Sequence, residues 1–245
     1  AGGERILEVL DEPISMTSPK DSELEITEGS ISFQHVSFKY HNEASENVLT
    51  DIHLSIPAGS TIGILGGTGS SKSTLVQLIP RLYDVSEGQV LIDLHDVREY
   101  SLSHLRSSIA MLLQKNTLFS GTVRENLLWG NPNADDAALK QALQIACADE
   151  FVNAFPDGLD TWLEQGGVNL SGGQKQLLCI ARALLKQPKI LIFDDSTSAV
   201  DSATEQSIKA GLAQLKNTTV IIIAQRISSV MSCDQIIILE EGKVN

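Results

Sequence analysis

Positive charge and long apolar runs are both scarce in this 245-residue sequence. Its 18 Lys and Arg residues face 31 Asp and Glu residues, which gives a formal net charge of -13. Because lysine and arginine supply the sequence-independent affinity for nucleic acid, this balance argues against a nucleic-acid partner. Apolar runs such as VIIIA at 220–224 fall far short of the roughly 20 residues that cross a bilayer. With no secretory signal at its start, the chain is expected not to span a membrane itself.

Cysteine is also scarce. Cys147, Cys179 and Cys233 lack the close spacing of a zinc site, and an odd, scattered set argues against a disulfide framework. This pattern favours a reducing cytosol. The sequence is nevertheless 42% apolar, which at this length is enough for one large domain or two intimate subdomains.

The first 28 residues differ in pattern from the rest. Residues 1–13 place apolar side chains at helical spacing until Pro13 stops the pattern, and residues 14–28 mix Ser, Pro and acids without a period. We therefore expect a linker over 1–28 and a folded domain over 29–245. In that domain, residues 31–40 and 48–56 alternate apolar and polar side chains, which predicts a small N-terminal antiparallel β layer.

Short apolar runs at 61–65, 189–193 and 218–224 are typical of strands covered on both faces. The segment at about 115–186 has little strand signal and shows the spacing of amphipathic helices. These patterns predict an α/β fold with a doubly wound parallel sheet and an inserted helical subdomain.

A glycine-rich loop lies between the strand pattern at 61–65 and a helical stretch at about 73–83. Its residues are Gly66, Gly67, Thr68, Gly69, Ser70, Ser71, Lys72, Ser73 and Thr74. Glycines let backbone N–H groups wrap a phosphate, while Lys72 would reach the β and γ phosphates and Ser73 would ligate Mg²⁺. The spacing is that of a P-loop, GxxxxGK[ST], and it predicts a P-loop NTPase core. Ser71 takes the last glycine position, where its Cβ is expected to crowd the phosphates and lower affinity.

The alternative for this loop is a Gly/Ser-rich turn that binds nothing. Its position after an apolar strand disfavours that alternative.

A second site marker is the acidic pair Asp194 and Asp195 after residues 189–193, at the sheet edge where doubly wound folds bind ligands. Asp194 is placed to hold Mg²⁺ through its water shell and Asp195 to orient an attacking water. Solvated acids at the start of a turn are the alternative.

The sequence LSGGQ at 170–174 precedes a helical stretch. Ser171, Gly172, Gly173 and Gln174 are therefore expected to form a second anion-binding surface at a helix N-terminus. A simple cap would explain the serine but not the glycine pair and the glutamine.

In this order, the motifs resemble the nucleotide-binding domain of ABC transporters, of the exporter type, from about Ile31 onward. The resemblance implies ATP and Mg²⁺ as ligands, with Tyr40 stacking on adenine. It makes Gln114 a glutamine that senses Mg²⁺ and couples to the membrane domains, and makes residues 116–130 the segment that meets intracellular loops. Glu164 would be the acid of the cross-communication loop, and residues 198–201 would be the D-loop.

The resemblance also implies partners and a location. Residues 1–13 look like the end of a last transmembrane helix, which would place the domain at the cytoplasmic face of the cell membrane beside its own transmembrane domain and intracellular coupling loops. In this family two nucleotide-binding domains pair head to tail, and each ATP lies between one chain's P-loop and the other chain's signature, which LSGGQ at 170–174 matches in this sequence. A second ABC nucleotide-binding domain is therefore the expected partner.

Several positions depart from the family pattern. Asp195 stands where the family has Glu, Gln225 where it has a switch histidine, Ser71 where it has Gly, and Leu177 where an arginine is common. Asp is one methylene shorter than Glu, and misplacement by about 1 Å costs roughly a hundredfold in rate. Gln225 cannot become cationic as histidine can.

Both losses act on the transition state, so MgATP binding is expected to outlast catalysis. The chain is therefore predicted to be the degenerate subunit of a heterodimeric, multidrug-type exporter, with its signature completing the site of a non-identical partner. A soluble ABC ATPase would show a coiled-coil insertion or a basic surface, and neither is present. A regulatory module that holds ATP as a structural ligand stays open. A P-loop kinase does not account for LSGGQ.

Overall fold

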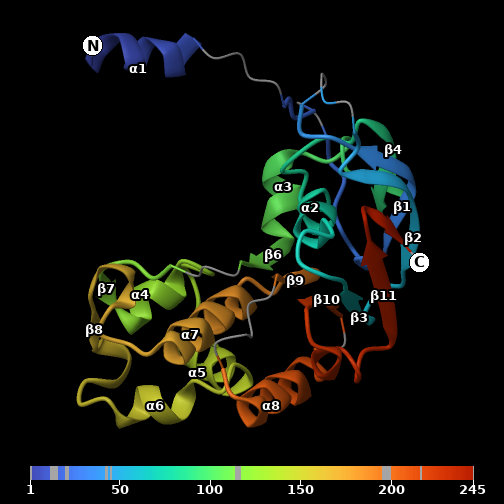
Figure 1. Cartoon of the computed structure of the whole chain (residues 1–245). Helices are drawn as coiled ribbons and strands as arrows, with labels where there is room; N and C mark the ends of the chain where they lie inside the picture. The colour runs from blue at the N-terminus through green and yellow to red at the C-terminus, as the bar shows by residue number, and fades with distance from the viewer. Residues whose placement is uncertain are drawn as a thin grey trace.

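A computed structural model describes residues 2–11, 16–19, 22–41, 44, 46–113, 117–194, 200–215 and 217–244. Two β-sheets lie close together, a group of helices extends from one of them, and helix α1 (Gly2–Asp11) stands away from both (Figure 1). No helix within the described ranges is long and apolar enough to cross a membrane.

The first sheet is antiparallel and has the order β2-β1-β4-β5. Its strands are β1 (Ile31–Phe38), β2 (Leu49–Ile56), β4 (Glu87–Ile92) and β5 (His95–Asp96). Ile52, Leu54 and Ile56 of β2 are all buried, as alternation along a half-buried strand requires. The predicted antiparallel layer is confirmed.

The second sheet has the order β12-β11-β3-β10-β9-β6, and its pairs are parallel except for the antiparallel pair β11 and β12. Its strands are β3 (Thr61–Leu65), β6 (Ile109–Leu112), β9 (Ile190–Asp194), β10 (Thr219–Ala224), β11 (Gln235–Glu240) and β12 (Lys243–Val244). All six residues of β10 are buried, because both faces of the sheet are covered. The predicted α/β fold is confirmed.

The helices after α1 are α2 (Lys72–Gln77), α3 (Leu102–Ser107), α4 (Val123–Leu128), α5 (Asp136–Ile145), α6 (Asp149–Ala154), α7 (Gly172–Leu185) and α8 (Ser202–Leu212). Short 3-10 helices span Gly158–Asp160, Gln165–Gly167 and Ile227–Ser229. Helices α4 to α7 lie within the segment expected to be helical. That segment also contains a two-stranded sheet of β7 (Gly121–Thr122) and β8 (Trp162–Leu163), whose strands are too short to leave a periodic pattern.

Helix α2 is shorter than the stretch of about 73–83 that the sequence predicts. It ends at Gln77 with Leu78 as its cap. Pro80 has no N–H to continue the helical ladder and disfavours helical geometry at the residue before it. Arg81 then takes a left-handed backbone conformation with φ 51°, so the chain turns away at this point.

The parallel sheet separates two apolar cores. In β9, Leu191 and Phe193 face the core shared with the helices, while Ile190 and Ile192 face the core shared with the antiparallel sheet. Because alternate side chains enter the two cores, β9 is buried on both faces. The carboxyl ends of β3, β9 and β10 thereby lie at one edge of the sheet, with Asp194 as the last residue of β9.

Candidate functional site

The loop between β3 and α2 closes around the side chain of Lys72. Its Nζ lies 2.8 Å from the Gly66 carbonyl oxygen, 2.7 Å from that of Gly67 and 3.1 Å from Ser70 Oγ. Gly66 is required here because an added Cβ would lie 2.3 Å from the Leu239 carbonyl oxygen. With Lys72 only 8% exposed, a buried ammonium sits inside the predicted phosphate loop.

Ser71 has the conformation that glycine would adopt at this position. Its φ is 70° and its ψ is 20°, and its side chain makes no capping hydrogen bond to α2. A left-handed conformation costs an L-residue roughly 1–2 kcal/mol. The departure from the P-loop pattern therefore strains the backbone, while its effect on phosphate affinity stays a prediction.

Ser73 and Asp194 meet although 121 positions separate them. Ser73 Oγ donates a hydrogen bond of 2.9 Å to Asp194 Oδ1, and Asp194 is largely buried at the end of β9. A hydroxyl and a carboxylate are the hard oxygen ligands that Mg²⁺ prefers. The two side chains therefore fit the predicted metal site.

A pocket of about 410 Å³ opens beside this pair and is lined by Thr68, Gly69, Ser70, Ser71, Lys72, Ser73, Thr74, Asp194, Ile223 and Gln225. Gln225 is exposed directly after β10, and β10 pairs with both β3 and β9. The fold thus brings the P-loop, Asp194 and Gln225 to one pocket. Asp195 and Gln114 lie outside the described residues.

Tyr40 is held against the helix that follows the loop. Its hydroxyl lies 2.8 Å from Thr74 Oγ1, and one of the two hydroxyls donates to the other. Its ring meets those of Phe38 and Tyr83 edge to face and remains 45% exposed. Stacking of this ring on adenine stays a prediction. Tyr83 was not predicted as part of the site, because only the fold brings it beside Tyr40.

The signature residues form a capping box at the start of α7. Ser171 Oγ accepts a hydrogen bond of 3.2 Å from the Gln174 N–H, and Gln174 Oε1 accepts one of 3.0 Å from the Ser171 N–H. Capping therefore explains the glutamine as well as the serine, and only Gly172 and Gly173 are left for another role. Leu177 is buried in the helical core, so it packs the helix at the position where the family commonly has arginine.

The described lining of the P-loop pocket contains none of residues 170–174. The two predicted phosphate surfaces thus do not meet in one chain. Asp201, the last residue of the predicted D-loop, accepts hydrogen bonds from the N–H groups of Ala203 and Thr204 and from Thr204 Oγ1, and so caps α8. The side-chain hydrogen bond from Thr204 is the main reason that the pKa of Asp201 lies below its usual value. Residues 195–199 lie outside the described part of the chain.

An aromatic groove lies on the helical part, far along the chain from the P-loop. It has a volume of about 660 Å³ and is lined by Ser120, Gly121, Glu125, Leu128, Trp129, Pro132 and Trp162. Phe119 stacks on Trp129 at a centroid distance of 4.9 Å. Trp129 and Trp162 are 68% and 61% exposed, and large apolar side chains gathered on a surface mark interaction sites.

Comparison with known sequences agrees with this geometry. A family model described as ABC transporter matches residues 49–198. A putative multidrug export ATP-binding/permease protein of Staphylococcus aureus strain NCTC 8325 is 42% identical over 241 residues, which are 98% of this chain and 42% of that protein. The counterpart from the bovine strain RF122 is 41% identical over the same share. The chain therefore spans about 42% of the length of these curated relatives.

Among solved structures, a bacterial Atm1-family ABC exporter with ATP bound has a TM-score of 0.93 and 32% sequence identity. The similarity covers 99% of this chain and 43% of that one. It extends over both β-sheets and the helical part.

Proposed function

This chain belongs to the ABC transporter family, and on that premise we propose that it is the MgATP-binding domain of a membrane exporter. The proposal depends on the pocket at the sheet edge, where the P-loop, the buried Lys72 ammonium and the Ser73 and Asp194 pair lie together. The similar proteins named above as multidrug export proteins and as an ATP-bound exporter support it.

The residues of the P-loop pocket and Tyr40 would each have a role in holding the nucleotide. Backbone N–H groups of the loop would surround the phosphates, and Lys72 would exchange its carbonyl partners for phosphate oxygens. Ser73 and Asp194 would hold Mg²⁺, which would supply positive charge to neutralise the negative charge that develops on the phosphates. Tyr40 would stack on the adenine base. Gln114 remains a proposed Mg²⁺ ligand and coupling residue.

Hydrolysis on this chain's own P-loop is proposed to be slow. Asp195 is a short carboxylate for orienting water, and Gln225 offers a neutral hydrogen bond at the pocket where a histidine could offer a charged one. Ser71 adds strain to the loop that must wrap the phosphates. None of these departures removes Lys72, Ser73 or Asp194, which are proposed to bind MgATP.

The signature is proposed to serve a second, non-identical ABC domain. Because Ser171 to Gln174 lie outside the P-loop pocket of their own chain, they would act on a nucleotide only when another chain presents one. In a head-to-tail pair, the N–H groups of Gly172 and Gly173 would meet the partner's γ-phosphate. This arrangement leaves one competent and one impaired site in each pair.

The aromatic groove is proposed to receive an intracellular loop of the transmembrane domain. It lies within and beside the segment 116–130, and its exposed Trp129 and Trp162 suit an apolar anchor in a pocket. Docking at this groove would place the domain at the cytoplasmic face of the membrane.

Binding and turnover of radiolabelled ATP with Mg²⁺ test the proposal on the full chain. We expect saturable binding with slow turnover, and loss of binding in Lys72→Ala. The matched control is Lys140→Ala, which removes a lysine from α5 outside the pocket. Absence of specific binding by the wild-type chain would refute the proposal.

The asymmetry has its own test in the complete exporter. Replacing Ser171 and Gly172 should slow hydrolysis at the partner's P-loop, while replacing Asp194 of this chain should change total turnover little. Rapid hydrolysis at the Lys72 site in an exporter built from two identical copies would contradict the asymmetric arrangement.

A further inference from the structure

The segment between α1 and β1 is fastened to the domain at several points. We call its described residues, 16–19 and 22–30, the strap. The Thr17 carbonyl oxygen accepts a hydrogen bond of 3.1 Å from Arg81 Nη1, and Ser18 Oγ accepts one of 2.9 Å from the Leu102 N–H. Further along, Asp93 accepts backbone N–H groups of residues 27–30 at 2.9 Å. The sequence predicts only a surface linker here, whereas the structure has a docked segment.

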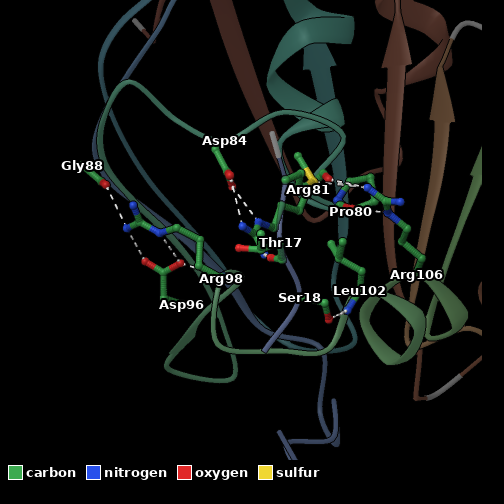
Figure 2. Close-up of polar contacts among 11 residues, drawn as sticks. Thr17, Ser18, Pro80, Arg81, Asp84, Gly88, Asp96, Arg98, Leu102 and Arg106 are labelled. Carbon is green, nitrogen blue, oxygen red and sulfur yellow. Dashed lines mark hydrogen bonds and ion pairs between the residues drawn. The ribbon is translucent and has the colours of Figure 1, made fainter. Parts of the chain in front are cut away.

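Arg81 joins the strap to the turn that ends the P-loop helix. Its Nε and Nη2 bind both carboxylate oxygens of Asp84 at 2.6 and 3.1 Å, which leaves Nη1 for Thr17 (Figure 2). The side chain is only 6% exposed. A buried guanidinium held in a two-point fork has a fixed direction, so movement of the turn after α2 would carry the strap with it.

Arg106, on α3, connects the same turn to the end of α7, the helix that begins at the signature. Its Nη2 donates to the Arg81 carbonyl oxygen at 2.7 Å and its Nε to that of Pro80 at 3.3 Å. Its own carbonyl oxygen accepts a hydrogen bond from Nζ of Lys186, the residue that caps the end of α7. Arg106 Nη2 also lies 3.5 Å from the sulfur of Met16 in the strap.

These contacts converge on one junction, formed by Arg81, Arg106 and Lys186. The helix that begins at the P-loop and the helix that begins at the signature both end there, and the strap lies on it. We propose that Arg81 and Arg106 are positioning residues that couple occupancy of the P-loop to docking of the strap.

This inference rests on the proposed function, because it takes MgATP as the ligand of the P-loop. Coupling between two sites is reciprocal: a nucleotide that tightens strap docking is itself bound more tightly when the strap is docked, by the same factor. The junction therefore predicts two linked effects of one substitution, a weaker nucleotide affinity and a strap that no longer responds to nucleotide.

Hydrogen exchange of the full chain, with and without ATP and Mg²⁺, measures the strap directly. In the wild type we expect the nucleotide to slow amide exchange of residues 16–18, and of the Leu102 N–H that donates to Ser18, by about fivefold. In Arg81→Met this slowing should disappear, and the ATP dissociation constant should rise by about the same factor.

The matched control is Arg98→Met. Arg98 makes the same two-point pair with Asp96 and also donates to the Gly88 carbonyl oxygen (Figure 2), and these described contacts lie outside the strap. It should keep both the wild-type affinity and the nucleotide-dependent slowing. Since Arg81 is buried, Ser18→Ala provides a second variant, which removes only the acceptor for Leu102 and should reduce the slowing without unfolding the chain.

Three results would overturn the proposal. Strap exchange that is identical with and without bound ATP in the wild type would show that no coupling exists. Slowing that persists in a folded Arg81→Met, or slowing that is undiminished in Ser18→Ala if Arg81→Met does not fold, would show that these contacts do not carry it. A wild-type chain that binds no ATP would remove the proposed function and this inference together, an outcome distinct from the other two.

Discussion

Replacing Ser71 with glycine should relieve the strain at the start of α2. Ser71 lies at φ 70° and ψ 20°, where an L-residue is destabilised by roughly 1–2 kcal/mol. Glycine adopts this conformation without that cost, but it loses about 0.5–1 kcal/mol more backbone entropy on folding. The balance predicts that Ser71→Gly raises the free energy of unfolding by about 0.5–1 kcal/mol.

Urea unfolding of wild type, Ser71→Gly and Ser71→Ala measures this difference. Ser71→Ala is the control, because it keeps the Cβ and removes a hydroxyl that makes no capping hydrogen bond to α2. Its stability should stay within about 0.5 kcal/mol of wild type. An alanine variant stabilised as much as the glycine variant would refute the reasoning, since the hydroxyl and not the backbone would then be responsible.

The same variants separate strain from phosphate crowding. If the Cβ of Ser71 crowds the phosphates, Ser71→Gly should bind MgATP more tightly than wild type, whereas Ser71→Ala should not. Equal affinities in all three proteins would limit the role of Ser71 to the backbone.

Three further predictions concern the residues proposed to slow hydrolysis, the aromatic groove and the strap. Asp195→Glu combined with Gln225→His should raise ATP turnover in the complete transporter by up to about a hundredfold, measured as phosphate release; no gain would mean that another departure or the partner limits the rate. Trp129→Ala should weaken association with the transmembrane part by about 2 kcal/mol, measured as a binding constant, whereas Leu94→Ala, at an exposed apolar residue in the turn between β4 and β5, should not. Burial alone raises the pKa of Asp93, but four backbone N–H donors from the strap outweigh it and hold this pKa below 3.8. The stabilisation is therefore present above pH 3.8 and lost as pH falls through the lower folded pKa; hydrogen exchange of the strap should accelerate over that acid range in wild type and lose this step in Asp93→Asn.

Local patterns predicted much of this fold. Period-two alternation located β1 and β2, and short apolar runs located β3, β9 and β10, because burial on one or both faces of a sheet leaves a direct mark on composition. The predicted end of α2 was wrong. The apolar spacing continues past Pro80, but the backbone cannot continue the helix there. The sheet of β7 and β8 left no periodic signal because each strand is two residues long.

The sequence by itself determined the order of the phosphate loop, the acidic strand end and the signature, because each is a run of adjacent residues whose spacing sets its chemistry. Tertiary structure alone decided which of these runs meet. Packing of β3 beside β10 and of β10 beside β9 brings Ser73 to Asp194, and it leaves Ser171 outside the pocket. The contact of Thr17 with Arg81, 64 positions apart, likewise depends on a backbone carbonyl and a buried guanidinium, and a backbone atom that every residue carries leaves no trace in sequence.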